Sequence, residues 1–282
     1  MHIPVMVAEA LEYLAVRPDG VYIDATAGLG GHTREIARRL TTGVVIANDR
    51  DAESLDIARQ NTLEWANRIH YRHGNFSALA EAGLGKVDGV LADLGASRFQ
   101  LTEAQRGFSF MSDGPLDMRM DRTAQTTADD LVNHMAEKAL ADLIYQLGEE
   151  RRARKIARAI VRARPIRSSL HLAGVVERAV PRTGRLHPAT QTFMALRMAV
   201  NEEQKELDAL LEVAPEVTAS GGRIVIISFM SLEDRKVKEK FRSLGRENRA
   251  TILTKHPIQP AEDEIRSNAA SRSAKLRALE MK

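Results

Sequence analysis

Apolar and polar residues alternate in two different rhythms along the first hundred residues. Short runs rich in Val, Ile and Leu have the length and composition of buried strands. These runs lie at residues 21–24, 44–49, 69–72 and 87–93. Between them, apolar residues recur at helical spacing, as Ile36, Ala37 and Leu40 do after the first run. Strands that alternate with helices are typical of βαβ units, so this region predicts a mostly parallel sheet.

The rhythm changes after residue 93. An irregular stretch rich in Gly, Asp, Met and Arg covers residues 101–122, and from about 127 to 210 only helical patterns appear. Strand-like runs return at 222–229 and 251–254. We therefore predict an α/β fold interrupted by a helical insertion. Its expected parts are a first sheet segment at 1–104, the irregular loop with the helical insertion at 105–200, and a second sheet segment at 201–282.

Composition narrows the class of protein. The 282 residues are 44% hydrophobic and 28% charged, which is ordinary for a globular chain. No apolar run approaches the roughly 18 residues that a membrane helix needs, and the N-terminus lacks a signal-peptide core. The absence of cysteine excludes disulfides and thiolate metal sites, and the histidines are scattered, so we expect no metal site. These features predict a soluble, cytoplasmic protein.

Positive charge is concentrated in one segment. The whole chain has a net charge of +3, yet residues 151–185 contain eleven basic residues and one acidic residue, a net charge of +10. A local excess of this size is typical of a surface that binds a polyanion, most often nucleic acid. A solvated helix face is the alternative that charge alone leaves open.

The turn after the first expected strand is rich in glycine. It reads Asp24-Ala-Thr-Ala-Gly28-Leu-Gly30-Gly31. In open parallel sheets ligands bind beyond the carboxyl ends of the strands, and glycine lets the backbone adopt positive φ or lie against a ligand. Asp49 ends the second strand, where an acidic side chain accepts hydrogen bonds from a ribose. This arrangement predicts a nucleoside-containing cofactor, and a tight connection without a ligand is the alternative.

Two features favour S-adenosylmethionine over a nicotinamide dinucleotide. Thr33 stands where the dinucleotide fingerprint has its third glycine or alanine. Acidic residues also end the first and fourth expected strands, Asp24 and Asp93. These carboxylates would repel a pyrophosphate but attract a cationic sulfonium nucleoside. An NAD-dependent oxidoreductase remains as the less favoured alternative.

The motifs in their order along the whole chain resemble the MraW/RsmH-type methyltransferases. The segments that carry the resemblance are His2-Ile-Pro4-Val5, Asp24–His32, Asp49-Arg-Asp51, Asn75-Phe76, Asp88–Gly95, Arg106–Phe110, Gly114–Asp121, Gly148–Arg151, His187–Thr190, Ala195–Arg197, Asn201, Ser231–Arg235 and Ser273–Arg277. The resemblance implies a Rossmann-like class I methyltransferase fold. It also implies methyl transfer from S-adenosylmethionine to the N4 amine of a cytidine in 16S small-subunit ribosomal RNA. A non-catalytic, nucleoside-binding ribosome assembly factor is the alternative from another class.

The resemblance further implies which residues hold the cofactor. Asp49 would bind the ribose, Phe76 would lie beside the adenine, and others would close the pocket. The implied set is Gly30, Gly31, His32, Asp49, Phe76, Asp93 and Gln100. The alternatives are that His32 is an ordinary residue at a helix N-terminus and that Phe76 belongs to the core. Asp51 is expected to cap the next helix rather than to bind the ligand.

Methyl transfer to an amine needs a hydrogen-bond acceptor that takes up the developing positive charge. Asp93 or Asp117 would supply it, and an ion pair between Asp117 and Arg119 is the structural alternative. The expected partner is small-subunit ribosomal RNA or the 30S particle. The residues expected to contact its phosphates are Arg151, Arg154, Lys155, Arg158 and Arg162.

The sequence departs from the family pattern at three places along the chain. They are Arg98-Phe99 where Ser-Pro is usual, Met230 where His is usual, and Ala269-Ala270 where Pro-Arg is common. We expect these departures to leave the cofactor site unchanged and to affect how RNA is engaged. Ser231–Asp234 also predicts a helix capping box, so part of that motif is expected to be structural.

Overall fold

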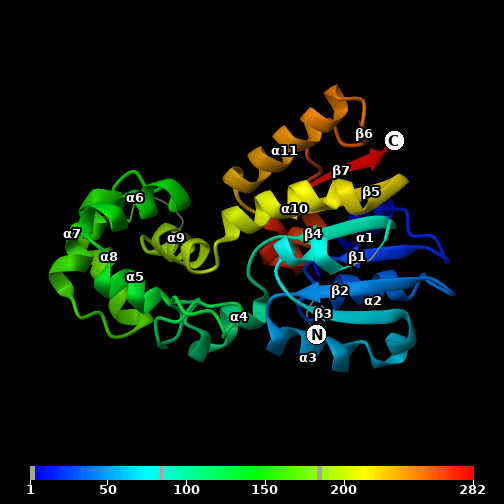
Figure 1. Ribbon diagram of the computed structural model, residues 1–282. Coiled ribbons are helices and arrows are strands. Elements are labelled where there is room, and N and C mark those ends of the chain that lie inside the picture. The colour runs from blue at the N-terminus through cyan, green and yellow to red at the C-terminus, as the bar shows by residue number, and fades with distance from the viewer. Residues whose placement is uncertain (1–3, 83–84, 183–185) are drawn as a thin grey trace. The chain divides into compact units, whose positions relative to one another are not determined.

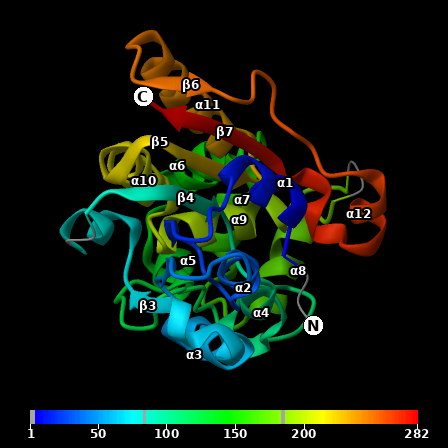
Figure 2. The same cartoon turned by 90° about the vertical axis from the view of Figure 1, so that its right-hand side faces the viewer.

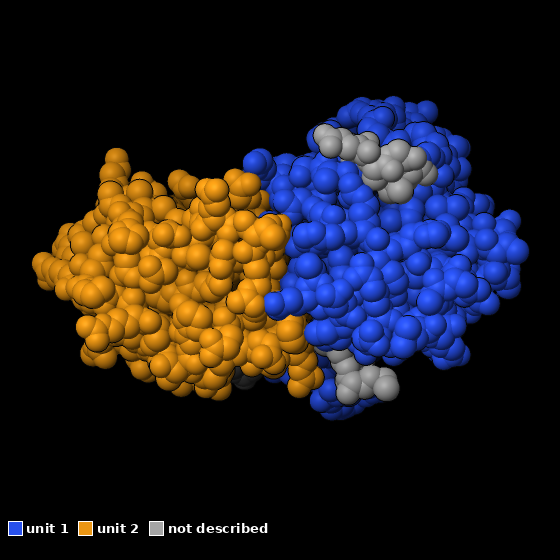
Figure 3. Space-filling view, turned by 60° about the horizontal axis from the view of Figure 1, so that its bottom comes forward, with its two compact units in different colours: residues 1–95, 204–282 blue, residues 96–203 orange. Residues whose placement is uncertain are grey.

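The computed structural model describes residues 4–82, 85–182 and 186–282. It consists of two compact units, one formed by Met1–Gly95 with Gln204–Lys282 and the other by Ala96–Glu203 (Figure 3). The second unit therefore begins at Ala96 rather than at the expected residue 105. His2, which belongs to a segment that carries the family resemblance, lies outside the described residues.

The first unit is built on a seven-stranded sheet (Figure 1). The strand order is β3-β2-β1-β4-β5-β7-β6, and Figure 2 shows β3 and β6 at its two edges. Neighbouring strands from β3 to β5 are parallel, whereas β7 runs antiparallel between β5 and β6. The strands are β1 (Val21–Asp24), β2 (Val44–Asp49), β3 (Ile69–His73), β4 (Val87–Asp93), β5 (Thr218–Ser228), β6 (Ala250–Ile252) and β7 (Lys275–Met281). This sheet confirms the predicted Rossmann-like α/β fold class, and β1, β2 and β4 occupy the predicted ranges.

The end of the sheet differs from the prediction. β5 begins at Thr218 rather than at residue 222, and β6 ends at Ile252, two residues short of the expected strand. The apolar pattern does not predict β7, because the charged Arg277 lies in its centre. That side chain is buried and donates to Asp234 on the neighbouring helix at 2.6 Å. An ion pair with a residue distant in sequence thus allows a charged residue to enter an inner strand.

Helices cover both faces of the sheet (Figure 1). Because side chains alternate along a strand, β1 contributes Tyr22 to the core on one face and Ile23 to the core on the other. The Tyr22 face is covered by α1 (Val7–Leu14), α2 (Gly31–Ala37) and α3 (Ala52–Asn61). The Ile23 face is covered by α10 (Glu203–Val217) and α11 (Ser231–Arg246). Shorter pieces are the 3₁₀ turns η1 (Leu63–Arg68), η2 (Phe76–Ala82) and η4 (Ala269–Ser273), and the helix α12 (Glu262–Ser267).

The second unit is helical around its own apolar core. Its helices are α4 (Arg98–Thr102), the 3₁₀ turn η3 (Ala104–Arg106), α5 (Ala128–His134), α6 (Glu137–Gly148), α7 (Ala153–Ala163), α8 (Ser169–Ala179) and α9 (Thr190–Val200). The irregular segment between η3 and α5 contributes Phe108, Leu116 and Met118 to this core. It is therefore a packed loop rather than a loose connection. Within the described parts of the chain, no helix has the length and apolar character that a membrane span requires.

Candidate active site

The turn between β1 and α2 is fixed by hydrogen bonds to the neighbouring strand. The backbone amide of Gly28 donates to Asp49 Oδ2 at 2.7 Å, and the amide of Ala27 donates to the carbonyl of Asn48 at 2.9 Å. The other carboxylate oxygen of Asp49 accepts from the amide of Asp51 at 2.9 Å. Since β1 and β2 are adjacent and parallel, their carboxyl ends meet at one edge of the sheet. The glycine turn and Asp49, which the sequence linked to a nucleoside, therefore lie side by side.

Packing inside the protein explains two of the three glycines in this turn. Gly30 has a φ of 85°, and a Cβ there would lie 2.9 Å from Thr62 Cγ2. A Cβ on Gly31 would lie 2.9 Å from Pro4 Cβ. Either side chain would displace a neighbouring segment, whatever ligand is bound. A Cβ on Gly28 would meet nothing nearer than a backbone oxygen at 3.9 Å, so this glycine leaves open space beside its backbone.

Asp24 lies fully buried beneath the turn. Its Oδ2 accepts from the hydroxyl of Thr33 at 2.6 Å, and its Oδ1 accepts from the amide of Thr26 at 3.2 Å. Burial raises the pKa of Asp24 to about 6, although these hydrogen bonds oppose the rise. The hydrogen bond to Asp24 therefore gives a structural role to the threonine at position 33, where a dinucleotide fingerprint has glycine or alanine. Asp24 supports the turn from below, and Asp51 caps α3 as expected.

His32 begins the buried side of α2. Its Nε2 lies 2.9 Å from the carbonyl oxygen of Val5. Because a carbonyl only accepts, Nε2 carries the proton and Nδ1 is left as an acceptor. Burial lowers the pKa of His32 to about 4, so the ring is neutral at pH 7. Nδ1 faces Asp93, with 3.8 Å between Nδ1 and Oδ2, but a neutral ring supplies no counter-charge to the carboxylate.

Asp93, at the end of β4, has a carboxylate oxygen without a partner. Its Oδ1 is buried and forms no hydrogen bond with any described residue. Burial raises the pKa of Asp93 well above its usual range, and the nearby carboxylates of Asp24, Glu233 and Glu264 raise it further. The backbone amide of Asp93 donates to Thr26 Oγ1 at 2.6 Å, which holds the strand end against the glycine turn. A half-buried carboxyl group with one buried oxygen is thus placed among other acids, and no described residue supplies a compensating cation.

Asp49 and Asp93, at the ends of β2 and β4, form what we call the acidic rim. Buried polar groups in proteins are normally paired, so a group bound beside Asp93 would supply the partner that its buried Oδ1 lacks among the described residues. A positively charged group at this edge would satisfy Asp93, whereas a phosphate would be repelled. Burial also raises the pKa of Asp49, to about 6. The residues present therefore fit the sulfonium nucleoside expected from the sequence.

The segment after β3 is anchored by a buried glutamate. Phe76 is half-buried and packs against the core on the α10 face of the sheet. The next residue, Ser77, donates to Glu206 from its amide at 3.0 Å and from its hydroxyl at 3.1 Å. Phe76 thus packs against the core, as the structural alternative expected, and is still partly exposed. Sequence reasoning missed Glu206, because it lies 129 residues from its partner and no local pattern marks it.

In the second unit, Gln100 forms part of a helix cap. Its side-chain oxygen accepts from the amide of Ser97 at 2.9 Å, and Ser97 Oγ accepts from the amide of Gln100 at 3.2 Å. This reciprocal capping box starts α4. The expected contact between Gln100 and the cofactor stays a prediction.

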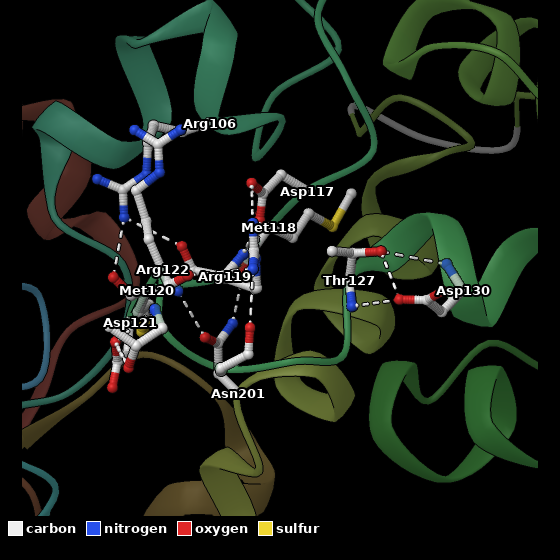
Figure 4. A network of polar contacts seen from close by, with 12 residues as sticks. Arg106, Asp117, Met118, Arg119, Met120, Asp121, Arg122, Thr127, Asp130 and Asn201 are labelled. Carbon is white, nitrogen blue, oxygen red and sulfur yellow. Dashed lines mark hydrogen bonds and ion pairs between the residues drawn. The ribbon is translucent and has the colours of Figure 1, made fainter.

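Figure 4 shows the polar network that holds the irregular loop. Asp117 accepts from Arg119 with both carboxylate oxygens, at 2.7 and 3.0 Å, which is the structural alternative expected for this pair. Partial burial opposes ionisation, but the hydrogen bonds from Arg119 keep the pKa of Asp117 below its usual value. Asn201 donates to the carbonyl of Met118 and accepts from the amide of Met120, both at 2.7 Å. The loop is therefore fixed through its backbone.

Sequence reasoning also missed what Arg106 and Asn201 do in this loop. Arg106 is buried and donates to the carbonyls of Arg119 and Met120 at 3.0 Å each. Met118 has a φ of 60°, a strained conformation for a residue with a side chain, and these hydrogen bonds hold it there. Both residues stand in segments that carry the family resemblance, but a sequence does not reveal that a polar side chain is buried.

The basic residues expected at RNA lie on or just before α7, and all five are exposed. They are Arg151, Arg154, Lys155, Arg158 and Arg162. Arg158 lies 3.4 Å from a carboxylate oxygen of Glu137, and the other four form no ion pair with a described residue. The first turn of α7 contains no acidic residue, so Arg154 and Lys155 lie uncompensated at the positive end of the helix dipole. An anion at this surface would be strongly attracted.

The capping box expected at Ser231–Asp234 is shifted by one residue. Glu233 accepts from the backbone amides of Phe229 and Met230, at 3.2 and 3.1 Å. Ser231 is already the first residue of α11, because the chain turns into the helix directly after β5. Asp234 pairs with β7 instead of closing the cap. The sequence correctly predicted a capping box at the start of this helix, but the structure forms it with Met230 and Glu233 instead of Ser231 and Asp234.

The fold and the site define a Rossmann-like α/β protein with an acidic rim at the carboxyl ends of its parallel strands. The chain belongs to the MraW methylase family, whose model matches residues 1–282, so the resemblance seen in the sequence is confirmed. It is 70% identical to a ribosomal RNA small subunit methyltransferase H from Solibacter usitatus (strain Ellin6076), over 100% of both chains. It is 48% identical to the protein of the same name from Acidobacterium capsulatum, over 100% of this chain and 98% of that one. A crystal structure of a candidate rRNA-methylase from Clostridium thermocellum is similar in fold, with a TM-score of 0.50 at 11% identity over 100% of both chains.

Proposed function

We propose that this protein transfers a methyl group from S-adenosylmethionine to the exocyclic N4 of a specific cytidine in 16S small-subunit ribosomal RNA. Family membership and the names of the relatives support methyl transfer to small-subunit ribosomal RNA. The resemblance of the sequence motifs supports the N4 amine of a cytidine as the target. The observation that carries the proposal is the unpartnered, buried carboxylate oxygen of Asp93, beside the glycine turn. A cationic methyl donor bound here would supply the partner that this oxygen lacks.

In this proposal the first unit holds the cofactor. Asp49 accepts hydrogen bonds from the ribose, and the exposed part of Phe76 lies beside the adenine. Asp93 attracts the positive charge. The turn with Gly30, Gly31 and His32 provides the backbone around it. Gln100 is proposed as a further cofactor residue on the family resemblance alone.

S-adenosylmethionine supplies an electrophilic methyl group on a positively charged sulfur. The cytosine amine is a weak nucleophile because its lone pair is delocalised into the ring. The protein must therefore hold the amine in line and take up the positive charge that develops on it. Asp93 is the proposed acceptor, since its Oδ1 has no partner among the described residues and can accept the proton that the amine releases. Neutral His32 leaves the carboxylate free of a permanent counter-charge.

Asp117 is proposed to act in the same reaction by positioning the loop. Both of its oxygens bind Arg119, and the lowered pKa makes it a poor proton acceptor. Asp117→Asn should lower turnover far more than cofactor affinity, because it loosens the loop and leaves the acidic rim unchanged. Unchanged turnover would remove Asp117 from the reaction.

The exposed arginines of α7 are proposed to contact RNA phosphates. Arg154, Arg158 and Arg162 follow one another at intervals of four residues and share one helix face. Changing all three to glutamine should weaken binding to 16S ribosomal RNA and reduce the slope of log affinity against log salt by about 2–3. Cofactor affinity should stay unchanged. Equal salt slopes for the parent and the variant would count against this role.

Incubation of the protein with methyl-labelled S-adenosylmethionine and unmethylated 30S particles tests the reaction. We expect label in the RNA, recovered as N4-methylcytidine after digestion to nucleosides. A protein that binds the particle and the cofactor but transfers no label would be a non-catalytic assembly factor. A protein that binds a pyridine dinucleotide instead would refute the assignment of the cofactor site.

A further inference from the structure

The α11 helix carries a row of basic residues that the reaction does not use. Arg235, Lys238, Arg242 and Arg246 follow one another at intervals of three, four and four residues. In a helix with 3.6 residues per turn, these intervals place all four side chains on one face. The row is about 16 Å long, at 1.5 Å per residue. We call these four residues the α11 basic stripe.

The opposite face of α11 is the face that packs on the protein. Val237, Phe241 and Leu244 are buried in the core that covers the sheet. Figure 1 shows α11 beside α10, and two ion pairs join these helices. Lys236 Nζ lies 2.6 Å from Asp208, and Lys240 Nζ lies 2.6 Å from Glu212. The lysines on this flank are therefore neutralised by the neighbouring helix.

The basic stripe has no such compensation. Its three arginines are exposed and Lys238 is half-buried. None of the four forms a hydrogen bond or an ion pair with any residue in the described ranges. Glu239 is the acidic residue that shares this face, and it forms no ion pair with the stripe. Lys238, Arg242 and Arg246 are spaced four residues apart, where like charges repel each other and destabilise the helix.

We propose that the α11 basic stripe is a second RNA-binding surface, which contacts the phosphate backbone of the ribosomal RNA substrate. This proposal rests on the proposed function and assigns α11 a part in holding the substrate. Four cations with one glutamate among them leave this face with a net positive charge, which matches the regular negative charge of a nucleic acid strand. The contacts carry no base information, so they add affinity without selecting the target nucleotide.

The composition of α11 favours RNA over an anionic membrane. A helix that lies on a lipid surface needs large apolar side chains beside its basic residues. None of the exposed large hydrophobic residues of the described chain lies on α11, since Val237, Phe241 and Leu244 are turned into the core. A stripe of cations without apolar anchors is the pattern of a phosphate-binding surface.

Two matched variants of one helix test the proposal. Lys238→Gln with Arg242→Gln removes two charges from the stripe. Lys236→Gln with Lys240→Gln removes two charges that are paired with α10. The affinity of each full-length protein for a protein-free 16S ribosomal RNA transcript and for 30S particles is measured by filter binding over a range of potassium chloride concentrations. Cofactor affinity and the thermal midpoint are measured alongside.

We expect the stripe variant to bind the transcript roughly tenfold more weakly at low salt, with a salt slope reduced by about 1.4–1.8. Its cofactor affinity should be unchanged, and its thermal midpoint should not fall, because the repulsion along the helix is relieved. The control variant should keep the parent slope. Equal slopes for the parent and the stripe variant, or equal losses in both variants, would overturn the proposal.

A third outcome points to a different partner. Weaker binding to 30S particles with unchanged binding to the transcript would assign the stripe to an acidic ribosomal protein, and would overturn the RNA proposal. The test is independent of methyl transfer. A parent protein that binds RNA with the expected slopes but transfers no label refutes the proposed function and leaves the stripe supported.

Discussion

The substitution Asp93→Asn separates ligand binding from stability. Asparagine keeps the shape of the side chain and removes its charge. In the ligand-free protein the change should stabilise the fold by about 0.5–2 kcal/mol, because it removes a half-buried carboxyl group that lies among other acids. Binding of a cation should weaken at the same time. Removing one partner of a buried charge pair costs about 2–5 kcal/mol, and the 20% exposure of this side chain places the expected loss near the lower end.

A loss of about 2–3 kcal/mol corresponds to roughly 30- to 140-fold weaker binding. Calorimetric titration with S-adenosylmethionine measures this change, and thermal unfolding measures the stability. Asp88→Asn on the same strand is the matched control, since Asp88 is paired with Arg17 and with the amide of Val21. That control should lower the thermal midpoint and leave cofactor affinity unchanged. An Asp93→Asn protein that is less stable than the parent and binds the cofactor equally well would refute the argument from the orphaned oxygen.

Three further changes have defined outcomes. Thr33→Val removes the hydroxyl that donates to Asp24, and leaving that buried oxygen unsatisfied should lower the free energy of unfolding by about 1–3 kcal/mol in urea titrations. The pKa values of Asp24 and Asp49 are raised from 3.8 to about 6, so the folded state binds more protons than the unfolded state between these values. These two groups should therefore destabilise the ligand-free protein least below pH 4. The free energy of unfolding should fall by up to about 3 kcal/mol per carboxylate as the pH rises through 6. A free energy of unfolding that stays constant between pH 4 and 7 would contradict this prediction. Asn201→Ala should destabilise the second unit by about 2–4 kcal/mol, because two buried backbone groups of the loop lose their partner. Local hydrogen exchange at Met118 and Met120 should rise with it, and unchanged protection would show that other contacts hold the loop.

Local sequence patterns were sufficient for the parts of the fold whose chemistry repeats along the chain. The apolar runs of β1, β2 and β4 are buried on both faces of the sheet, so their boundaries follow from the residues themselves. The position of Asp49 and Asp93 at one edge then follows from the parallel order of the strands. The family motifs supplied the reaction and its RNA, which no periodicity of the chain contains. Residues that depend on distant partners, such as Arg277 in β7, broke the local pattern and were not predicted.

What the sequence determined by itself was the type of fold and the segment with the highest positive charge, and it also predicted where a nucleoside-type site would lie. The tertiary structure decided which polar side chains support the site and which are left unsatisfied. Thr33 under the turn, Glu206 behind Ser77 and Asn201 beneath the loop act through partners that folding brings to them. Burial, ion pairing and pKa depend on all neighbouring atoms, so a carboxylate such as Asp93 acquires its properties only when the chain has folded around it.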